Sequence, residues 1–154
     1  MVRGATGHPK TGTIKVNIGY RDSFVGEGQI SYSGPTSLEK AKLAMEIVQK
    51  RLELTGVECM ESRYELIGIN SIFGDAISSQ WSSSPPAEVR LRVVARTKDR
   101  QSATQVGWEI QSLPMNGPAG GGAHRTYVDE VLSIASILVD EKDVKLSNKY
   151  VEVP

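Results

Sequence analysis

The sequence E-V-R-L-R-V-V-A-R-T at Glu88–Thr97 alternates between apolar and mostly basic side chains over its whole length. Val89, Leu91, Val93 and Ala95 share one face, and Arg90, Arg92, Val94 and Arg96 share the other. A period of two residues with one apolar face is typical of a half-buried strand. This stretch predicts a β-sheet with one face in the core and an open face that carries arginine.

Two amphipathic helices flank this strand in the sequence. In residues 36–54, one stripe is formed by Leu38, Ala41, Met45, Val48 and Leu52. Thr36 and Glu39 have the spacing of a capping box, and Gly56 is placed to end the helix. In residues 99–113, Asp99 is the expected N-cap, Pro114 the expected stop, and the stripe consists of Ala103, Val106, Ile110 and Leu113.

The remaining apolar segments predict further strands. Residues 13–21 and 24–33 form a hairpin around an Arg21-Asp22-Ser23 turn, and Gly26 and Gly28 are typical of a bulge. Residues 63–72 and 128–139 add two strands, and 144–153 adds an edge strand. Residues 73–86, with Trp81, form a long serine-rich connection.

The order of these elements predicts the fold class. Without the first and last strands it is β-α-β-β-α-β, the split βαβ or ferredoxin-like arrangement of the α+β class. Its antiparallel sheet carries two helices on one face and has extra edge strands. We expect residues 1–154 to form a single domain with an irregular N-terminal tail over residues 1–12.

The composition narrows the class of protein. Eighteen basic residues balance 18 acidic ones, so no net field attracts nucleic acid or a membrane. Aromatic residues make up 6% of the chain, which leaves little for base stacking on the open face. The single Cys59 suits a reducing compartment, and no apolar run is long enough to span a membrane. A soluble cytoplasmic protein is expected, with neither nucleic acid nor membrane as a partner.

The expected open face contains the first group of candidate site residues. It carries Lys15, Asn17, Arg21, Glu27, Gln29, Arg90, Arg92 and Arg96. Arginine binds carboxylate or phosphate through two parallel hydrogen bonds, so Arg21, Arg90, Arg92 and Arg96 are candidate anion ligands. Alternatively, this face is solvated and carries scattered ion pairs, or it binds another subunit.

A glycine-rich segment, Asn116–Arg125, contains the second group. Gly120, Gly121 and Gly122 could expose backbone N–H groups to an anion beside His124 and Arg125, or the segment could be a flexible connection. The segment leads into a strand, so it lacks the helix N-terminus that strengthens phosphate binding. His124 is a candidate general base and Cys59 a candidate nucleophile, but each has an inert alternative. No metal-ligand spacing is present, and no metal or cofactor is expected.

Several motifs together resemble the acyclic terpene utilisation (AtuA-type) family. They include R-G-A-T-G at residues 3–7, Y-R-D at 20–22, L-I-G-I-N-S at 66–71, the strand at 88–96 and N-G-P-A-G-G at 116–121. The resemblance covers nearly the whole chain, but it matches only the C-terminal part of the family's main region. It implies a role in the breakdown of branched isoprenoid acids, and it carries over no catalytic residue.

Two functions are therefore expected, and the sequence leaves open whether either includes catalysis. In the first, the chain is an excised domain or a separate subunit that assembles with itself or with the family's N-terminal region and completes a site there. In the second, it is the part of an enzyme that binds an acidic small molecule, acyl-CoA or a carboxylate, through the arginines and the glycine-rich segment.

Overall fold

The computed structural model describes residues 3–80, 86–145 and 147–152. Two compact units make up the chain. The larger unit is Arg21–Val131, and the smaller one combines Met1–Tyr20 with Leu132–Pro154. The prediction of a single domain stays a prediction, because two compact units can belong to one folding domain.

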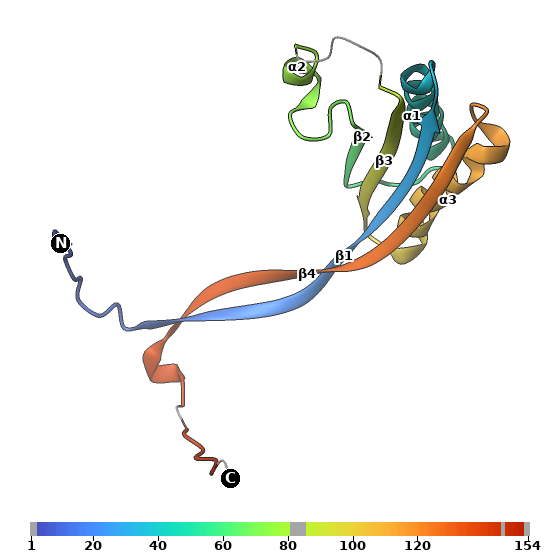
Figure 1. Ribbon diagram of the computed structural model, residues 1–154. Helices are drawn as coiled ribbons and strands as arrows, with labels where there is room; N and C mark the ends of the chain where they lie inside the picture. The colour runs from blue at the N-terminus through green and yellow to red at the C-terminus, as the bar shows by residue number, and fades with distance from the viewer. Residues whose placement is uncertain (1–2, 81–85, 146, 153–154) are drawn as a thin grey trace. The chain divides into compact units, whose positions relative to one another are not determined.

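One antiparallel sheet organises the larger unit, with the strand order β2-β3-β1-β4 (Figure 1). The elements along the chain are β1 (Thr13–Ser33), α1 (Ser37–Leu54), β2 (Glu61–Ile67), α2 (Gly74–Ser78), β3 (Glu88–Thr97), α3 (Arg100–Asn116), β4 (Gly121–Asp140) and the 3-10 turn η1 (Glu141–Asp143). This order and connectivity confirm the predicted α+β, ferredoxin-like fold.

The core lies between the sheet and the helices α1 and α3. All four apolar side chains predicted for the inner face of β3 are buried there, as is the complete predicted stripe of α3. On α1, Ala41, Val48 and Leu52 are buried, and Leu38 and Met45 pack against the core's edge. The 3.6-residue and two-residue periods in the sequence therefore located the buried faces correctly.

Glycine in β1 allows α3 to approach the sheet closely. A methyl group at Gly26 would lie 2.0 Å from the carbonyl oxygen of Ala103, and one at Gly28 would lie 2.5 Å from Ile110 Cγ1. The pairing of β1 with β3 continues without interruption from Phe24 to Ser33. The predicted bulge is therefore wrong, and these glycines provide space for a helix.

The predicted hairpin at Arg21-Asp22-Ser23 is also wrong, since β1 passes straight through these residues. The neighbouring strand β4 pairs with β1 and satisfies its backbone hydrogen bonds, so a hairpin is not needed to satisfy them. The side chains of Asp22 and Ser23 instead bind the guanidinium of Arg96 on β3.

Several element boundaries differ from prediction. The strand predicted over residues 63–72 ends at Ile67, because Gly68 turns with φ 97° and the Asn70 side chain accepts the Leu66 N–H at 2.8 Å. The helix α2 lies in the predicted connection 73–86, whose Trp81 is outside the described residues. The strand predicted over 144–153 is wrong for its described residues, 144–145 and 147–152.

The helix ends differ in two details. No side-chain cap is formed by Thr36, so the predicted capping box is wrong; the Ser37 hydroxyl instead donates to Pro86 O at 2.8 Å. Pro114 lies inside α3, which continues to Asn116. A proline this close to the C-terminus removes one helical hydrogen bond without ending the helix, and Gly117 N–H still reaches Leu113 O at 2.8 Å.

Asp99 is the N-cap of α3, as predicted. Its carboxylate accepts the Ser102 backbone N–H at 2.8 Å and the Ser102 hydroxyl at 2.9 Å. The backbone hydrogen bond, above all, lowers the pKa of Asp99. We expect Asp99→Ala to lower Tm by about 2–4 °C at neutral pH. Because the folded-state pKa is depressed, this contribution disappears as the pH falls through it, and thermal unfolding at pH 7 and pH 2.5 checks this.

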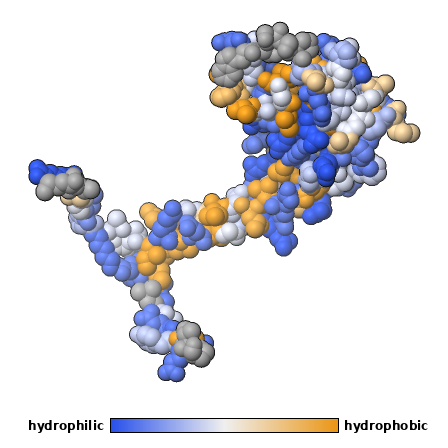
Figure 2. All heavy atoms as spheres, in the orientation of Figure 1, coloured by the Kyte–Doolittle hydropathy of each residue, from blue (hydrophilic) through white to orange (hydrophobic). Residues whose placement is uncertain are grey.

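The smaller unit contains a two-stranded ribbon, formed by residues 13–20 of β1 and 132–140 of β4. Glu141 N–H donates to Gly12 O at 2.9 Å, and the Ser136 hydroxyl donates to Asn17 Oδ1 at 2.7 Å. Both contacts fit one antiparallel register. Near the end of the ribbon, Lys10 and Glu141 form an ion pair of 2.6 Å. Apolar residues follow the length of this ribbon (Figure 2).

No helix among the described residues combines the length and the apolar character needed to cross a membrane.

Candidate functional site

Three of the predicted arginines lie in one row on the open face of the sheet. Arg90, Arg92 and Arg96 alternate with the buried residues of β3 and are themselves half-buried. Because β3 lies between β2 and β1, side chains from both neighbouring strands flank the row. The prediction of an arginine-bearing open face is therefore confirmed, and the partners of these arginines determine what the row can bind.

Arg92 is held between two carboxylates. Its Nη2 donates to Glu27 Oε2 at 2.6 Å, and its Nη1 donates to Glu65 Oε2 at 3.0 Å. The carboxylate of Glu65 is 7% exposed and also pairs with Arg63. The hydrogen bond from Arg92 holds the pKa of Glu27 below its usual value, and the hydrogen bond to Glu27 raises the pKa of Arg92. This cluster links β1, β3 and β2 across the sheet.

The other two arginines of the row are also engaged by their neighbours. Arg90 donates to the Ser31 hydroxyl at 2.9 Å and to Gln29 Oε1 at 3.2 Å. Arg96 donates to the Ser23 hydroxyl at 2.7 Å and pairs with the carboxylates of Asp22 and Glu61. These contacts join neighbouring strands of the sheet. An anion that bound to this face would have to displace them.

Arg21 lies apart from the row. Its Nε is 3.2 Å from Glu130 Oε1, and its side chain is 82% exposed. An ion pair this exposed contributes little to stability and leaves the guanidinium hydrated.

The glycine-rich segment lies on the helix side of the sheet. A methyl group at Gly121 would lie 2.8 Å from Ile30 Cδ1 and 3.0 Å from Tyr32 Cε1, both in the core. Gly120 has φ 85°, and Lys40 Nζ is the nearest atom to its missing side chain. The hydroxyl of Tyr32 is buried, without a hydrogen-bond partner among the described residues. The segment leads into a strand as predicted, but β4 already begins at Gly121, which shortens the loop.

His124 and Arg125 belong to a third location. Together with Gln111, Thr126 and Tyr127 they line a recess of about 310 Å³ beside α3. None of the β3 arginines lines this recess. The predicted site residues therefore lie in separate places: the open face, the loop at the core and the recess on β4. Gly122 has open space around it.

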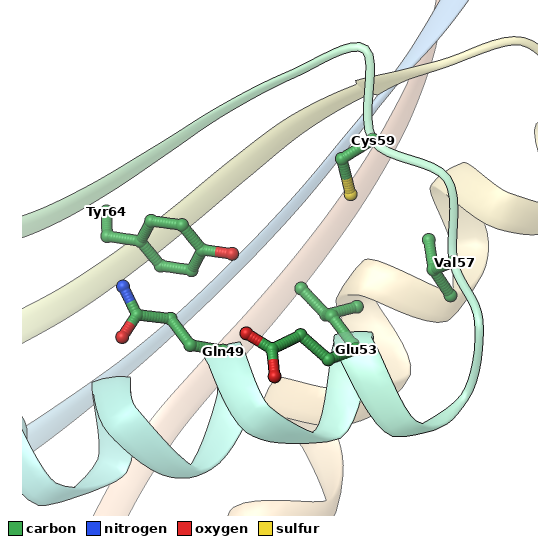
Figure 3. Close-up of a pocket in the computed structure, with 6 residues that line it drawn as sticks. Gln49, Glu53, Val57, Cys59 and Tyr64 are labelled. Carbon is green, nitrogen blue, oxygen red and sulfur yellow. The ribbon is translucent and has the colours of Figure 1, made fainter.

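A further pocket of about 490 Å³ lies between α1 and β2 (Figure 3). Gln49 and Glu53 line it from α1, Tyr64 lines it from β2, and Val57 and Cys59 line it from the connection between them (Figure 3). Leu52 of α1 also lines the pocket. Sequence reasoning missed this pocket apart from Cys59, because a pocket between two elements depends on how they pack.

The chemistry of this pocket does not activate its thiol. Burial raises the pKa of Cys59 and also that of Tyr64, so both groups stay protonated at neutral pH. Glu53 is paired with Lys50 at 2.7 Å. Among residues 3–80, 86–145 and 147–152, no group of three or more His, Cys, Asp or Glu side chains could hold a metal ion.

Binding of an acidic small molecule stays a prediction from the sequence. In the described part of the chain, the arginine row and the glycine-rich segment lie on opposite faces of the sheet, and the row's donors already have acceptors.

Comparison with known proteins gives one family match. No curated protein and no solved structure matches the chain significantly. The model of the acyclic terpene utilisation family protein AtuA matches residues 1–150. The match covers nearly all of the chain and confirms the resemblance seen in its motifs, so the chain belongs to the acyclic terpene utilisation (AtuA) family.

Proposed function

We propose that this chain is an assembly module of a cytoplasmic AtuA-type protein, and that its ribbon inserts into an apolar groove of the family's N-terminal region. That region belongs to the same or to a separate polypeptide. Family membership supplies the link to acyclic terpene utilisation. The observation that carries the assembly role is the exposure of large apolar side chains along the ribbon.

The first face of the ribbon is almost entirely apolar. In the register fixed by the Gly12–Glu141 and Asn17–Ser136 contacts, Ile14 lies opposite Val139, and Val16 lies opposite Ile137. Residues opposite each other in an antiparallel pair point to the same face. Ile18 and Tyr20 continue this face and are nearly half exposed.

The second face also carries large apolar side chains. Leu132, Ile134 and Leu138 are 70%, 72% and 71% exposed, and they share this face with Lys15 and Asn17. A two-stranded ribbon that is apolar on both faces is at best marginally stable in water without a cover. Both faces therefore favour burial against another surface.

The dimensions of the ribbon favour a groove as its partner. Nine residues at about 3.4 Å each, in two strands about 5 Å apart, give one face of a few hundred Å². A stable complex buries about 800 Å² per partner, which requires both faces. A symmetric contact with a second copy covers only one face of each ribbon, whereas a groove in a larger partner covers both.

Replacing Leu132 and Leu138 by aspartate tests the proposal. We mix the full chain with the separately produced N-terminal region of an AtuA-type protein and measure complex formation by size-exclusion chromatography with light scattering. We expect a complex with the unaltered chain and at least about 100-fold weaker binding for the double variant, because each buried leucine contributes about 1.5–3 kcal/mol.

Leu54→Asp is the matched control, since Leu54 is 73% exposed but lies on α1, outside the ribbon. It should bind as the unaltered chain does. No complex with the N-terminal region, or equal binding by the ribbon variant and the control, would contradict the proposal. Self-association that only the ribbon variant loses would instead identify a second copy as the occupant.

A further inference from the structure

One edge of the sheet is open and long. In the order β2-β3-β1-β4, the strand β4 is an end strand, and no strand of the described residues pairs with its outer edge. Residues 121–131 of β4 belong to the larger unit and contain no proline. An edge strand with unpaired N–H and C=O groups is a template for pairing with another strand.

The charges along this edge are arranged symmetrically about Tyr127. His124 and Arg125 precede it, and Asp129 and Glu130 follow it at equal spacing. When two such strands pair antiparallel with Tyr127 at the centre, Arg125 of one copy lies opposite Asp129 of the other, and the reverse holds by symmetry. His124 then lies opposite Glu130 of the other copy. The edge is therefore complementary in charge to itself.

The side chains of this pattern lie on the accessible face of β4. A methyl group at Gly107 of α3 would lie 2.9 Å from Thr126 Cβ, so Thr126 faces the helix. Because side chains alternate along a strand, Arg125, Tyr127 and Asp129 lie on the face of β4 opposite to Thr126. Arg125 and Tyr127 also border the recess that His124 lines at this edge. Arg125 and Asp129 are exposed, and Tyr127 is 47% exposed.

The ionic groups in the centre are available to a partner. Within residues 3–80, 86–145 and 147–152, neither Arg125 nor Asp129 forms an ion pair. Glu130 is already paired with Arg21 at 3.2 Å, so Arg125 and Asp129 are the main determinants of recognition.

We propose that β4 pairs antiparallel with β4 of a second copy, centred on Tyr127, and joins two four-stranded sheets into one. The charges select this register, since centring on Arg125 or Asp129 places like charges opposite each other, which is destabilising. Parallel pairing in register would also place each charge beside its equivalent. This interface is independent of the ribbon and of its partner.

Charge exchange between Arg125 and Asp129 tests the pairing. We measure the dimer dissociation constant of the full chain by sedimentation equilibrium. Arg125→Asp and Asp129→Arg should each weaken the homodimer at least tenfold, because each creates two like-charged pairs across the two-fold axis. The double variant Arg125→Asp/Asp129→Arg should restore dimerisation to within about threefold, since the complementary pairs are re-formed.

A mixture of the two single variants gives the sharpest result. The Arg125→Asp chain and the Asp129→Arg chain should form a heterodimer in preference to either homodimer, because every pair across the heterodimer joins opposite charges. Lys42→Asp, a charge reversal at an exposed position on α1, should leave the dimer unchanged. So should the ribbon variant Leu132→Asp/Leu138→Asp, which separates this interface from the ribbon.

Two results would overturn the proposal. The first is a chain that remains monomeric at every accessible concentration. The second is a dimer whose dissociation constant is the same for Arg125→Asp, Lys42→Asp and the unaltered chain. Circular dichroism of each variant establishes that a lost dimer reflects the changed edge in a folded chain.

Discussion

Gly26→Ala should lower the free energy of unfolding by at least about 3 kcal/mol. The added methyl group would lie 2.0 Å from the carbonyl oxygen of Ala103 and 2.9 Å from its Cα, which are backbone atoms of α3. A side chain can rotate away from an overlap, but a helix backbone moves only with its whole packed face. The change therefore pushes α3 away from β1, where overpacking costs 1–3 kcal/mol or more.

Two other glycines of β1 provide a graded control in urea unfolding followed by circular dichroism. A methyl group at Gly28 would overlap only side-chain atoms of Ile110, so Gly28→Ala should cost less, about 1–2 kcal/mol. Gly19 has nothing within 4 Å of the added carbon, and Gly19→Ala should change stability by less than about 0.5 kcal/mol. Equal effects at Gly26 and Gly19 would refute the close contact between β1 and α3.

The same glycines show where sequence patterns were sufficient and where they failed. The alternation at 88–97 and the two helical stripes identified the core, because burial imposes its period directly on the sequence. The role of Gly26 and Gly28 could not be predicted from the sequence, since a glycine in a strand is consistent with a bulge or with close approach of another element. Only the position of α3 distinguishes the two.

The prediction of a hairpin in place of the continuous strand β1 was wrong for a related reason. Arg21-Asp22-Ser23 has the polar composition of a turn, but β4 lies alongside and satisfies the backbone of β1. Local propensity cannot include a partner that is about a hundred residues away in the chain.

The row of arginines on β3 was predictable from the sequence, but the partners of these arginines were not. Alternation placed Arg90, Arg92 and Arg96 on one face, but the ion pairs of Arg92 with Glu27 and Glu65 depend on the register of β3 with both neighbouring strands. The resulting ion pairs, and not the arginines alone, determine what this face can bind. The same applies to the ribbon: its apolar residues are evident in the sequence, but their exposure could not be predicted from it.

Arg92→Leu should destabilise the protein by about 3 kcal/mol at neutral pH. The substitution leaves the carboxylates of Glu27 and Glu65, which are 17% and 7% exposed, without their shared guanidinium. Removing one partner of a buried ion pair is costly because the remaining charge stays desolvated. Arg63 still contacts Glu65, so Glu27 loses the larger share of its stabilisation.

The loss should depend on pH in a defined direction. Hydrogen bonding to Arg92 holds the folded-state pKa of Glu27 below its usual value, so the stability it contributes is present above the unfolded pKa of about 4.3. That contribution is lost as the pH falls through the folded-state pKa. In Arg92→Leu the contribution is already missing, so the difference in unfolding free energy between the two proteins should shrink below about pH 4.

Arg90→Leu separates this charge effect from the loss of a long side chain. Arg90 is on the same face of β3, but its acceptors are the neutral groups of Ser31 and Gln29. Its variant should therefore show a deficit that stays nearly constant between pH 7 and pH 3. Urea unfolding of both variants across this range provides the comparison. Parallel pH profiles for the two variants would mean that Arg92 acts through packing, and that the carboxylates of Glu27 and Glu65 do not need its charge.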